Sequence, residues 1–278
     1  MENRFNDGIF RTRESLYKWT RNILRKYGIK PIKKLSQNFI IDPILLNNIR
    51  SHVMKLSTLE IGCGIGTLTL ALINTVNKLI CIEIDQRMLS VIADNIISPN
   101  LIAINADVRR FLPDVEQVVS NIPYHITSDI LIEIARNNSI QHVVITVQKE
   151  VADRIMSSPG SKAYGKITIL INVLFDVKIS GIYPPSSFYP APSVYHALLV
   201  MNRKKKYDEN IRFLERLVKT LFTQRRKRIE RILQKFVNID IHELGEVGKS
   251  IIGKRVYEVD WDTYYRLANH LLQMGAEI

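Results

Sequence analysis

Short apolar runs recur along the middle of the chain, and the stretches between them carry apolar residues at helical spacing. From about Leu56 to Val200 the runs are LEIG, LICIEID, LIAINAD, QVVSNIP and HVVITVQ, followed by a later pair around 173–182 and 197–200. Strands that alternate with helices in this way are typical of a mostly parallel sheet covered by helices. The pattern therefore predicts a doubly wound α/β domain.

The segments on either side of this region have a different pattern. Residues 12–27 place apolar side chains on one helical face, and Gly28 and Pro31 then end the helix. Residues 209–236 also show helical periodicity, and further short helices are expected after them. We therefore expect three parts: an N-terminal extension, residues 1–38; the α/β domain, residues 39–202; and a small all-helical C-terminal domain, residues 203–278.

Basic residues are concentrated in two flanking segments. The net charge is +12, of which residues 1–38 carry +7 and residues 203–235 carry +9, so the rest of the chain is slightly acidic at −4. A solvated helix face would explain either segment alone, but two such segments with interleaved aromatic residues favour a polyanionic partner, nucleic acid rather than a membrane.

The second basic segment contains the run TQRRKRIER at 223–231, which we expect to lie on a C-terminal helix. Arginine suits phosphate recognition, so this run predicts contacts to the RNA backbone. A solvated surface is the alternative for about half of its cations. The residues assigned to RNA binding are Arg225, Arg226, Lys227, Arg228 and Arg231.

Composition narrows the setting. No apolar run approaches the roughly 18–20 residues of a membrane span. The N-terminus has no apolar signal core, and its acidic residues argue against a transit peptide. Cys63 and Cys81 are the only cysteines and have no metal-site spacing, which suits a reducing interior. We expect a cytoplasmic protein that associates with no membrane and uses no metal.

A glycine turn stands at the first strand of the α/β region. In LEIGCGIGTLTLAL, a strand, a turn and a helix follow one another, with glycine at 62, 64 and 66. The spacing is G-x-G-x-G, which does not match the dinucleotide-binding motif G-x-G-x-x-G. No G-K-S/T follows, so the segment does not match a P-loop either. Gly62 and Gly64 would let the backbone approach a ligand at the carboxyl edge of the sheet. A purely structural tight turn is the alternative.

Acidic residues end the next two strands. LICIEID ends in acids, and Glu83 lies where a carboxylate accepts hydrogen bonds from a ribose diol in nucleoside-binding sheets of this kind. Asp107 closes INAD, in position to accept from an adenine amino group. A glycine turn and two acids at successive strand ends, with no evident phosphate site, predict a pocket for S-adenosylmethionine.

The segment SNIPYHI ends the fourth strand and faces the predicted methyl donor. An exocyclic adenine nitrogen is a weak nucleophile because its lone pair is delocalised into the ring. The side-chain oxygen of Asn121 and the carbonyl of Ile122 would accept its two hydrogens and free that lone pair. Pro123 would fix the carbonyl, and Tyr124 would stack on the base. A helix-capping turn is the alternative.

These motifs together resemble the ribosomal RNA adenine dimethyltransferases of the small subunit. The matching segments include KKLSQNFIID, EIGCGIGTLTL, SNIPYHI, VQKEVADRI, SKAYGKIT, PPSSFYPAPSV and LFTQRRKRIERIL, so the resemblance covers almost the whole chain. It implies a Rossmann-like class I methyltransferase sheet. It also implies that Asn38 and Ile40 close over the donor with Gln37 nearby, that Asn121 contacts donor and target, and that Phe188 stacks on the base opposite Tyr124.

The resemblance implies methyl transfer from S-adenosylmethionine to N6 of two adjacent adenines in small-subunit ribosomal RNA. We expect a monomer that acts on a pre-ribosomal particle. One alternative is the erythromycin-resistance type, which modifies large-subunit RNA, although FYPAPSV and QRRKRIERIL favour the small subunit. Another is a non-catalytic RNA- or DNA-binding factor on the same fold, against which the retention of Asn121, Pro123 and Tyr124 argues.

The chain departs from the family pattern at several positions. Ser36 replaces the usual glycine before Gln37, Cys63 replaces a common proline, and His125 replaces a common asparagine. The run VYH at 194–196 is also unusual. None of these departures removes a residue that is predicted to bind the donor or the target. They could change the affinity for the donor, but they do not imply that activity is lost.

Overall fold

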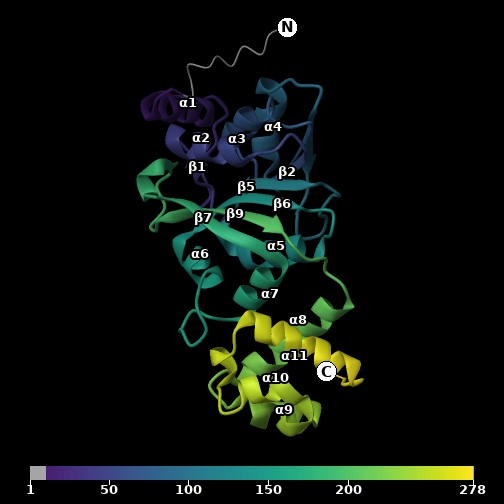
Figure 1. Cartoon of the computed structure of the whole chain (residues 1–278). Coiled ribbons are helices and arrows are strands. Elements are labelled where there is room, and N and C mark those ends of the chain that lie inside the picture. Colours follow the sequence, from purple (N-terminus) through teal and green to yellow (C-terminus); the bar gives the residue numbers. More distant parts are fainter. Residues whose placement is uncertain (1–10, 278) are drawn as a thin grey trace. The chain divides into compact units, whose positions relative to one another are not determined.

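The computed structural model describes residues 11–277 and divides into two compact units (Figure 1). The first unit runs to Ala152 and resumes at Lys178–Asn202, and the second consists of Asp153–Val177 and the residues from Arg203 onward. The predicted boundary near residue 203 therefore coincides with one crossing between the units. The segment Asp153–Val177, which we assigned to the α/β domain, groups instead with the C-terminal helices.

A seven-stranded sheet forms the centre of the first unit, in the order β4-β3-β2-β5-β6-β9-β7. Its strands are β2 (Ser57–Ile61), β3 (Lys78–Glu83), β4 (Leu101–Asn105), β5 (Gln117–Asn121), β6 (His142–Gln148), β7 (Phe175–Tyr183) and β9 (His196–Arg203). The five strands from β4 to β6 are parallel, and β9 runs antiparallel to β6. The predicted α/β sheet is confirmed, and the order reverses at β2, next to β5.

Helices cover both faces of this sheet. The helices of the first unit are α1 (Arg13–Lys26), α2 (Pro43–His52), α3 (Thr67–Leu72), α4 (Gln86–Asn95) and α5 (Thr127–Arg136), and α6 (Lys149–Ile155) spans the crossing to the second unit. In Figure 1, α2, α3 and α4 lie on one face of the strands and α5 lies on the other. The carboxyl ends of the parallel strands are thereby left open for the loops that follow them.

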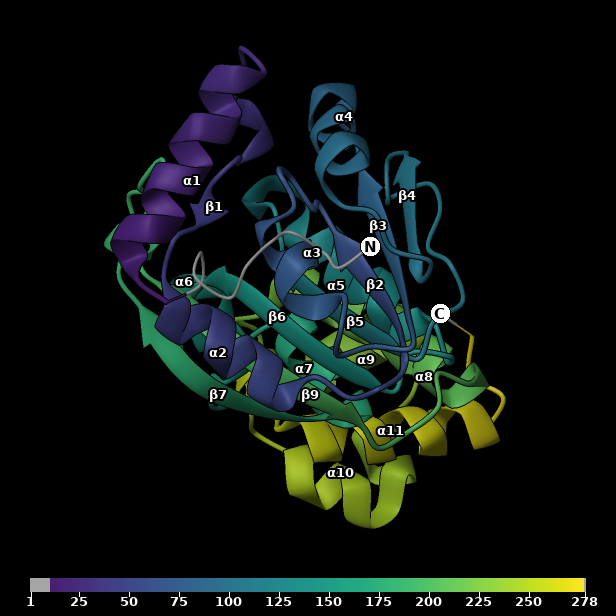
Figure 2. The same ribbon diagram turned by 90° about the horizontal axis from the view of Figure 1, so that it is seen from above.

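The N-terminal helix α1 is part of the first unit and not a separate extension. Thr12 caps it through a reciprocal pair of hydrogen bonds with Ser15. Leu16, Ile23 and Leu24 on its apolar face are buried in the core of the unit. After α1, the short strand β1 (Phe39–Ile40) pairs antiparallel with β8 (Phe188–Tyr189), and α1 lies beside β1 (Figure 2). Residues 1–10 of the predicted extension lie outside the described residues.

The second unit is helical. It contains α7 (Lys166–Leu174), α8 (Glu209–Leu221), α9 (Ile229–Val237), α10 (Gly245–Ile251) and α11 (Trp261–Gln273). α7 packs against α8 and α11, which explains why residues 153–177 group with this unit. Its centre includes Tyr264, whose hydroxyl donates to the carbonyl of Val256 at 2.6 Å.

The helical periodicity over 209–236 corresponds to two helices, α8 and α9, and the expectation that the whole run 223–231 lies on a helix is wrong. The backbone N–H groups of Val256 and Tyr257 donate to the carbonyls of Lys227 and Arg225 at 3.0 and 3.2 Å. Arg228 also forms a β-bridge with Arg255. These tertiary hydrogen bonds occupy the carbonyl groups of Arg225 and Lys227, which in a continuous helix would accept hydrogen bonds from residues one turn later. Four of the five cations assigned to RNA therefore lie in a turn, and only Arg231 lies on a helix.

Residues 11–277 contain neither a recognisable membrane span nor a metal cluster. No helix in this range has both the length and the apolar character needed to cross a bilayer. No group of three or more His, Cys, Asp or Glu side chains in it is arranged to hold a metal ion. Cys63 and Cys81 are free thiols, both buried. Cys81 lies beside the buried carboxyl of Glu60, to which its thiol donates at 3.4 Å.

Candidate functional site

A cleft opens at the carboxyl ends of the parallel strands, where β1 lies across them. All of the residues predicted to bind the donor line it, although they come from five separate segments of the chain. They are Gln37, Asn38, Ile40, Gly62, Gly64, Glu83, Asp107 and Asn121. Pro123 lines the cleft as well. The fold thus brings the predicted set together in one place.

The glycine turn after β2 permits close approaches on two sides. Gly62 has a φ of +70°, and a Cβ atom there would lie 3.2 Å from Cγ of Pro123. Gly64 has a φ of +55°, and a Cβ atom there would lie 2.9 Å from the ring of Phe39. A side chain at either position would be strained and would displace SNIPYHI or β1. The glycines therefore serve the assembly of the cleft as well as any ligand in it.

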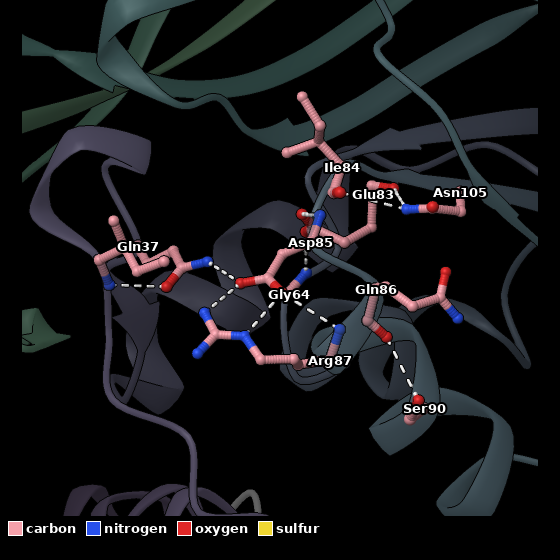
Figure 3. A network of polar contacts seen from close by, with 10 residues as sticks. Gln37, Gly64, Glu83, Ile84, Asp85, Gln86, Arg87, Ser90 and Asn105 are labelled. Carbon is pink, nitrogen blue, oxygen red and sulfur yellow. Dashed lines mark hydrogen bonds and ion pairs between the residues drawn. The ribbon is translucent and has the colours of Figure 1, made fainter.

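Backbone hydrogen bonds fix the carboxylate of Glu83 (Figure 3). Its Oε2 accepts from the N–H of Gly64, and its Oε1 accepts from the N–H of Asp85, both at 2.9 Å. Burial raises the pKa of this carboxyl, while the two backbone donors oppose that rise. The side chain is 7% exposed, and each oxygen keeps a lone pair for a further donor. A diol placed against it would meet a preoriented acceptor.

Asp85 ties the segment before β1 to the end of β3 (Figure 3). Gln37 donates to its Oδ2 at 2.9 Å, and the same amide accepts from the N–H of Ile32 at 2.8 Å. Arg87 donates to the carboxylate at 2.6 Å and lowers the pKa of Asp85. Gln37 therefore holds the chain over the cleft, a role that its sequence position alone did not distinguish from ligand binding. LICIEID contains two acids, Glu83 and Asp85, and from the sequence we assigned a role to Glu83 alone.

Asn121, at the end of β5, presents an acceptor with no partner. Its Nδ2 donates to the backbone carbonyl of Asn38 at 2.9 Å. That bond assigns the orientation of the carboxamide and leaves Oδ1 buried, without a hydrogen-bond partner among the residues that the structure describes. A buried acceptor left unpaired is costly, and such groups are uncommon outside functional sites. The oxygen belongs to a residue that lines the cleft, so a ligand donor is its natural partner.

Asn38 links this acceptor to the aromatic ring of SNIPYHI. Its side-chain amide donates to the hydroxyl of Tyr124 at 3.0 Å and to the carbonyl of Ser36 at 3.1 Å. The backbone carbonyl of the same residue holds Asn121. One residue of the segment before β1 therefore positions both the carboxamide and the ring, a connection that sequence spacing did not predict.

Asp107 is already paired with a cation. Arg109 donates to it through Nη2 at 2.6 Å and through Nε at 3.0 Å, and this guanidinium lowers the pKa of the carboxyl. The carboxylate stays ionised and has further lone pairs, so a role as acceptor for an adenine amino group is compatible with the pairing. Arg109 also lines the cleft and was not predicted.

Glu60, in β2, is a second unpredicted carboxyl in the cleft wall. It is 1% exposed and accepts from the hydroxyl of Thr69 at 2.7 Å. Burial raises its pKa to about 8, against the effect of that hydrogen bond, so the neutral acid is favoured at pH 7. The sequence signal for this buried carboxyl was a glutamate inside the otherwise apolar run LEIG.

The predicted stacking partner Phe188 is not open in this structure. Its ring is 2% exposed and packs against the ring of His196, with centroids 4.4 Å apart. His196 also contacts Tyr124, at 5.1 Å. The pairing of β8 with β1 buries Phe188 in the core, so the expectation of a free ring face opposite Tyr124 is corrected.

His196 itself is an unusual core residue. It is fully buried, and neither ring nitrogen makes a hydrogen bond of acceptable geometry among the described residues. Burial lowers its pKa to about 4, and an interaction with the backbone of Val194 opposes this only in part. The ring is therefore neutral at pH 7 and acts as packing between Tyr124 and Phe188.

Ser36 and His125, two departures from the family pattern, meet at the mouth of the cleft. The hydroxyl of Ser36 lies 3.4 Å from Nδ1 of His125, and both residues line the cleft. Ser36 has a φ of +53°, a left-handed conformation that glycine adopts at lower cost. The usual glycine is thus explained by backbone geometry, and its replacement adds strain and one weak contact.

The arginine segment of the second unit contains two kinds of side chain. Arg225 donates to the carbonyls of Lys162 and Ser161 at 3.1 and 3.2 Å, and its guanidinium lies 5.2 Å from the ring centre of Tyr257. These contacts give Arg225 a structural role within its unit. The other four cations assigned to RNA are exposed: Arg226, Lys227, Arg228 and Arg231.

Two curated relatives are similar to most of the chain. It is 39% identical over 238 residues to the Ribosomal RNA small subunit methyltransferase A of Lysinibacillus sphaericus (strain C3-41), covering 77% of this chain and 80% of that protein. It is 32% identical over 285 residues to the protein of the same name from Ligilactobacillus salivarius (strain UCC118), covering 92% and 95%. Both alignments extend well beyond the sheet.

Two solved structures share the fold. A dimethyladenosine transferase from Plasmodium falciparum superposes with a TM-score of 0.75 at 22% identity, over 86% of this chain and 98% of that one. The 23S rRNA methyltransferase ErmE superposes with a TM-score of 0.64 at 24% identity, over 85% and 100%. At these identities the likeness establishes the fold alone, that of a class I methyltransferase.

The sequence profile described as "Ribosomal RNA adenine dimethylase" matches residues 30–271. The matched span contains the whole cleft, the SNIPYHI segment and nearly all of the helical unit. A match of this extent, together with relatives above 30% identity over most of their length, leads to one conclusion: the chain belongs to the ribosomal RNA adenine dimethylase family.

Proposed function

We propose that this protein transfers methyl groups from S-adenosylmethionine to N6 of two adjacent adenines in small-subunit ribosomal RNA, twice on each base. The observation that carries the proposal is the buried, unpartnered Oδ1 of Asn121, which a hydrogen bond to Asn38 orients at the cleft. An acceptor held in this way needs a donor, and an adenine amino group supplies two.

The residues of the cleft fit the methyl donor. Three hydrogen-bond acceptors in the cleft have capacity for a ligand. They are the fixed carboxylate of Glu83, the ionised carboxylate of Asp107 and the unpartnered oxygen of Asn121. Glu83 would hold the ribose diol and Asp107 the adenine amino group, beneath a segment that Gln37 and Asn38 keep in place. When bound, S-adenosylmethionine supplies an activated methyl group on its sulfonium.

The chain's own residues prepare the target nitrogen. Asn121 would accept one hydrogen of the amino group, and the carbonyl of Ile122, directed by Pro123, would accept the other. Both bonds draw the nitrogen away from planarity with the ring and make its lone pair available. Tyr124, held by Asn38, would stack on the base. Alignment of this kind is the principal demand of a displacement at a sulfonium carbon.

The RNA partner and its setting are also part of the proposal. Both relatives described above are named for the ribosomal small subunit, which supports that substrate. We assign RNA binding to residues 203–278 and in particular to the exposed cations Arg226, Lys227, Arg228 and Arg231. Arg225 is left out, because its guanidinium is engaged within its unit. The expected setting is a pre-ribosomal particle in the cytoplasm, bound by a monomer.

The test is methylation of defined particles. The protein is incubated with labelled S-adenosylmethionine and small subunits that lack the dimethyladenosines, and the modified nucleotides are mapped. We expect label on N6 of two adjacent adenines, with loss of incorporation in Glu83→Ala. Large subunits form the second arm, because modification there and not in the small subunit would favour the erythromycin-resistance type. No incorporation in either particle would refute the proposal.

A further inference from the structure

An open groove of about 750 Å³ lies in the first unit between α1 and β8, apart from the donor cleft. Arg13 and Tyr17 of α1 form one wall, and Ile41, Phe188 and Tyr189 form the other. Its volume falls within the range of roughly 300–1,000 Å³ that is usual for ligand sites. We call it the α1–β8 groove, and none of the residues to which we assign a part in methyl transfer lines it.

One layer of side chains separates this groove from the donor cleft. Ile40 lines the cleft and the next residue, Ile41, lines the groove, as alternation along an extended chain requires. Ile40 pairs with Phe188, which lines the groove. The ring of Phe188 rests on His196, and His196 contacts Tyr124. Two buried side chains, Phe188 and His196, therefore connect the groove wall to the ring of Tyr124.

The groove offers aromatic surface. Tyr17 and Tyr189 meet edge to face, with centroids 5.4 Å apart and an interplanar angle of 85°. Both rings are half-buried, so they are held in place while part of each remains accessible. Arg21 lies 5.7 Å from the ring centre of Tyr17. Fixed rings beside cations are the usual platform for an unpaired base, because every base has a stacking face.

The charge of α1 favours a polyanion in the groove. Residues 11–34 carry nine Lys or Arg and one acid, Glu14, which lines the groove beside Arg13 and is paired with Lys18. Arg25 in the last turn is favoured by the helix dipole, but Arg13 stands in the first turn, where a cation is disfavoured. Arg13 lines the groove, so its cost to the helix is explained if it meets an anion there.

We propose that the α1–β8 groove binds the unpaired nucleotide next to the target adenine in the substrate RNA. Its base would lie against Tyr17 and Tyr189, and its phosphate would lie near Arg13. The inference rests on the proposed function, in which two adjacent adenines are substrates, and it places the second adenine in the groove while the first is methylated. A groove for a peptide would not require the cation in the first turn.

The first experiment compares two cations on one helix. Arg13→Ala and Arg25→Ala remove the same charge from sites about 18 Å apart along α1, and only the first lines the groove. Binding of a single-stranded RNA oligonucleotide with two central adjacent adenines is measured from 50 to 200 mM salt. We expect Arg13→Ala to lower the salt slope by about 0.7, as for one lost phosphate contact, and Arg25→Ala to leave it unchanged. Equal slopes in the two variants would overturn the proposal.

The second experiment is a double-mutant cycle between Tyr17 and the RNA. One RNA carries an abasic residue beside the target adenine, and Tyr17→Ala is tested on both RNAs. On the intact RNA we expect binding about 5- to 150-fold weaker, the range that base stacking supplies. On the abasic RNA the substitution should have little further effect. Tyr17→Phe should bind like wild type and shows that the ring carries the contact. Independent, additive losses would refute the assignment.

The methylation assay separates this inference from the function on which it rests. If the wild-type protein does not modify small subunits, the proposed function fails whatever the groove does. If it does modify them, the groove variants should raise the KM for the small subunit and leave donor affinity unchanged. Wild-type KM and wild-type oligonucleotide binding in both Arg13→Ala and Tyr17→Ala would show that RNA does not occupy the groove.

Discussion

The cleft of the first unit and the arginine segment of the second differ in how firmly the structure fixes the side chains that the sequence pattern singled out. In the cleft, Asn121, Glu83 and Gln37 are each held by hydrogen bonds of 2.8–2.9 Å, so their positions follow from the fold. In the arginine segment, Arg225 is bound to carbonyls of its own unit while Arg226 is exposed. Adjacent residues of one type thus have different roles.

The physical reason is burial. A polar group removed from water must find a partner, so its position is narrowly determined and a pattern of buried polar residues specifies a site. A charge in water is satisfied by solvent in many conformations, so a run of exposed cations specifies only an electrostatic field. The predictions below test this difference, from the largest expected effect to the smallest.

Asn121→Ala should show the largest effect. Removal of a preorganised hydrogen-bonding group typically lowers a rate by roughly 10²–10³, and we expect a loss of this size in single-turnover methylation at saturating donor. RNA binding should be retained, because the residue lies in the cleft and not among the exposed cations. Asn138→Ala, an exposed asparagine, is the control and should be fully active. An Asn121→Ala enzyme as fast as wild type would reduce SNIPYHI to a structural turn.

His196 should make the stability of the first unit sensitive to acid. Burial lowers its pKa from 6.5 to about 4, so the unfolded chain binds a proton between these values while the folded chain does not. The free energy of unfolding therefore has its full value, as far as His196 is concerned, above pH 6.5. It decreases as the pH falls towards 4, by about 3 kcal/mol in total.

Denaturant titrations of the wild-type protein and of His196→Leu at several pH values check this. Other titrating groups cancel in the difference between the two proteins. The difference in unfolding free energy should shift in favour of His196→Leu by about 3 kcal/mol between pH 7 and pH 4. A difference that does not change with pH would mean that the imidazole is solvated or paired.

The exposed cations should act on RNA and not on stability. Arg226, Arg228 and Arg231 changed together to alanine should flatten the salt dependence of small-subunit binding by about 0.9 per lost phosphate contact, up to roughly 2.7. The free energy of unfolding should stay within about 0.5 kcal/mol, as is usual at exposed sites. An unchanged slope would identify these residues as a solvated surface only.

Arg225→Ala should show the opposite behaviour. The substitution removes two hydrogen bonds to backbone carbonyls, so the unfolding free energy of the protein should fall by about 1–2 kcal/mol. The salt slope of RNA binding should match that of wild type. Because Arg225 and Arg226 are neighbours of the same type, Arg226→Ala is the matched control. Equal stability in the two variants would contradict the structural role of Arg225.

Ser36→Gly should give the smallest effect, a gain in stability. Glycine adopts the left-handed conformation of position 36 at a lower free-energy cost than serine does. The greater conformational freedom of glycine in the unfolded chain offsets part of this gain. We expect an increase of about 0.5–1 kcal/mol in the unfolding free energy, measured by thermal or denaturant unfolding. A loss of stability would show that the contact of Ser36 with His125 outweighs the strain.

Most of the sheet and the location of the cleft could be predicted from local pattern. The apolar runs coincide with β2 to β6. β2, β3, β5 and β6 are buried along most of their length, and a strand buried on both faces must be apolar throughout, whereas the edge strand β4 is apolar but largely exposed. Glu83 and Asn121 end their strands as expected, and parallel strands place their ends at one edge of the sheet. The donor-binding set followed from these two facts together with the family resemblance.

Tertiary contacts decided the rest. The amino-acid sequence by itself determined the parallel α/β sheet, the glycine turn and the polar residues at the strand ends, because these depend on periodicity and on backbone freedom at single positions. Only the folded chain pairs β8 with β1 and so buries Phe188, orients the carboxamide of Asn121 by its hydrogen bond to Asn38, and separates α8 from α9 around Arg225. Each of these depends on a partner remote in sequence, and local pattern carries no information about which remote group will satisfy a buried polar atom.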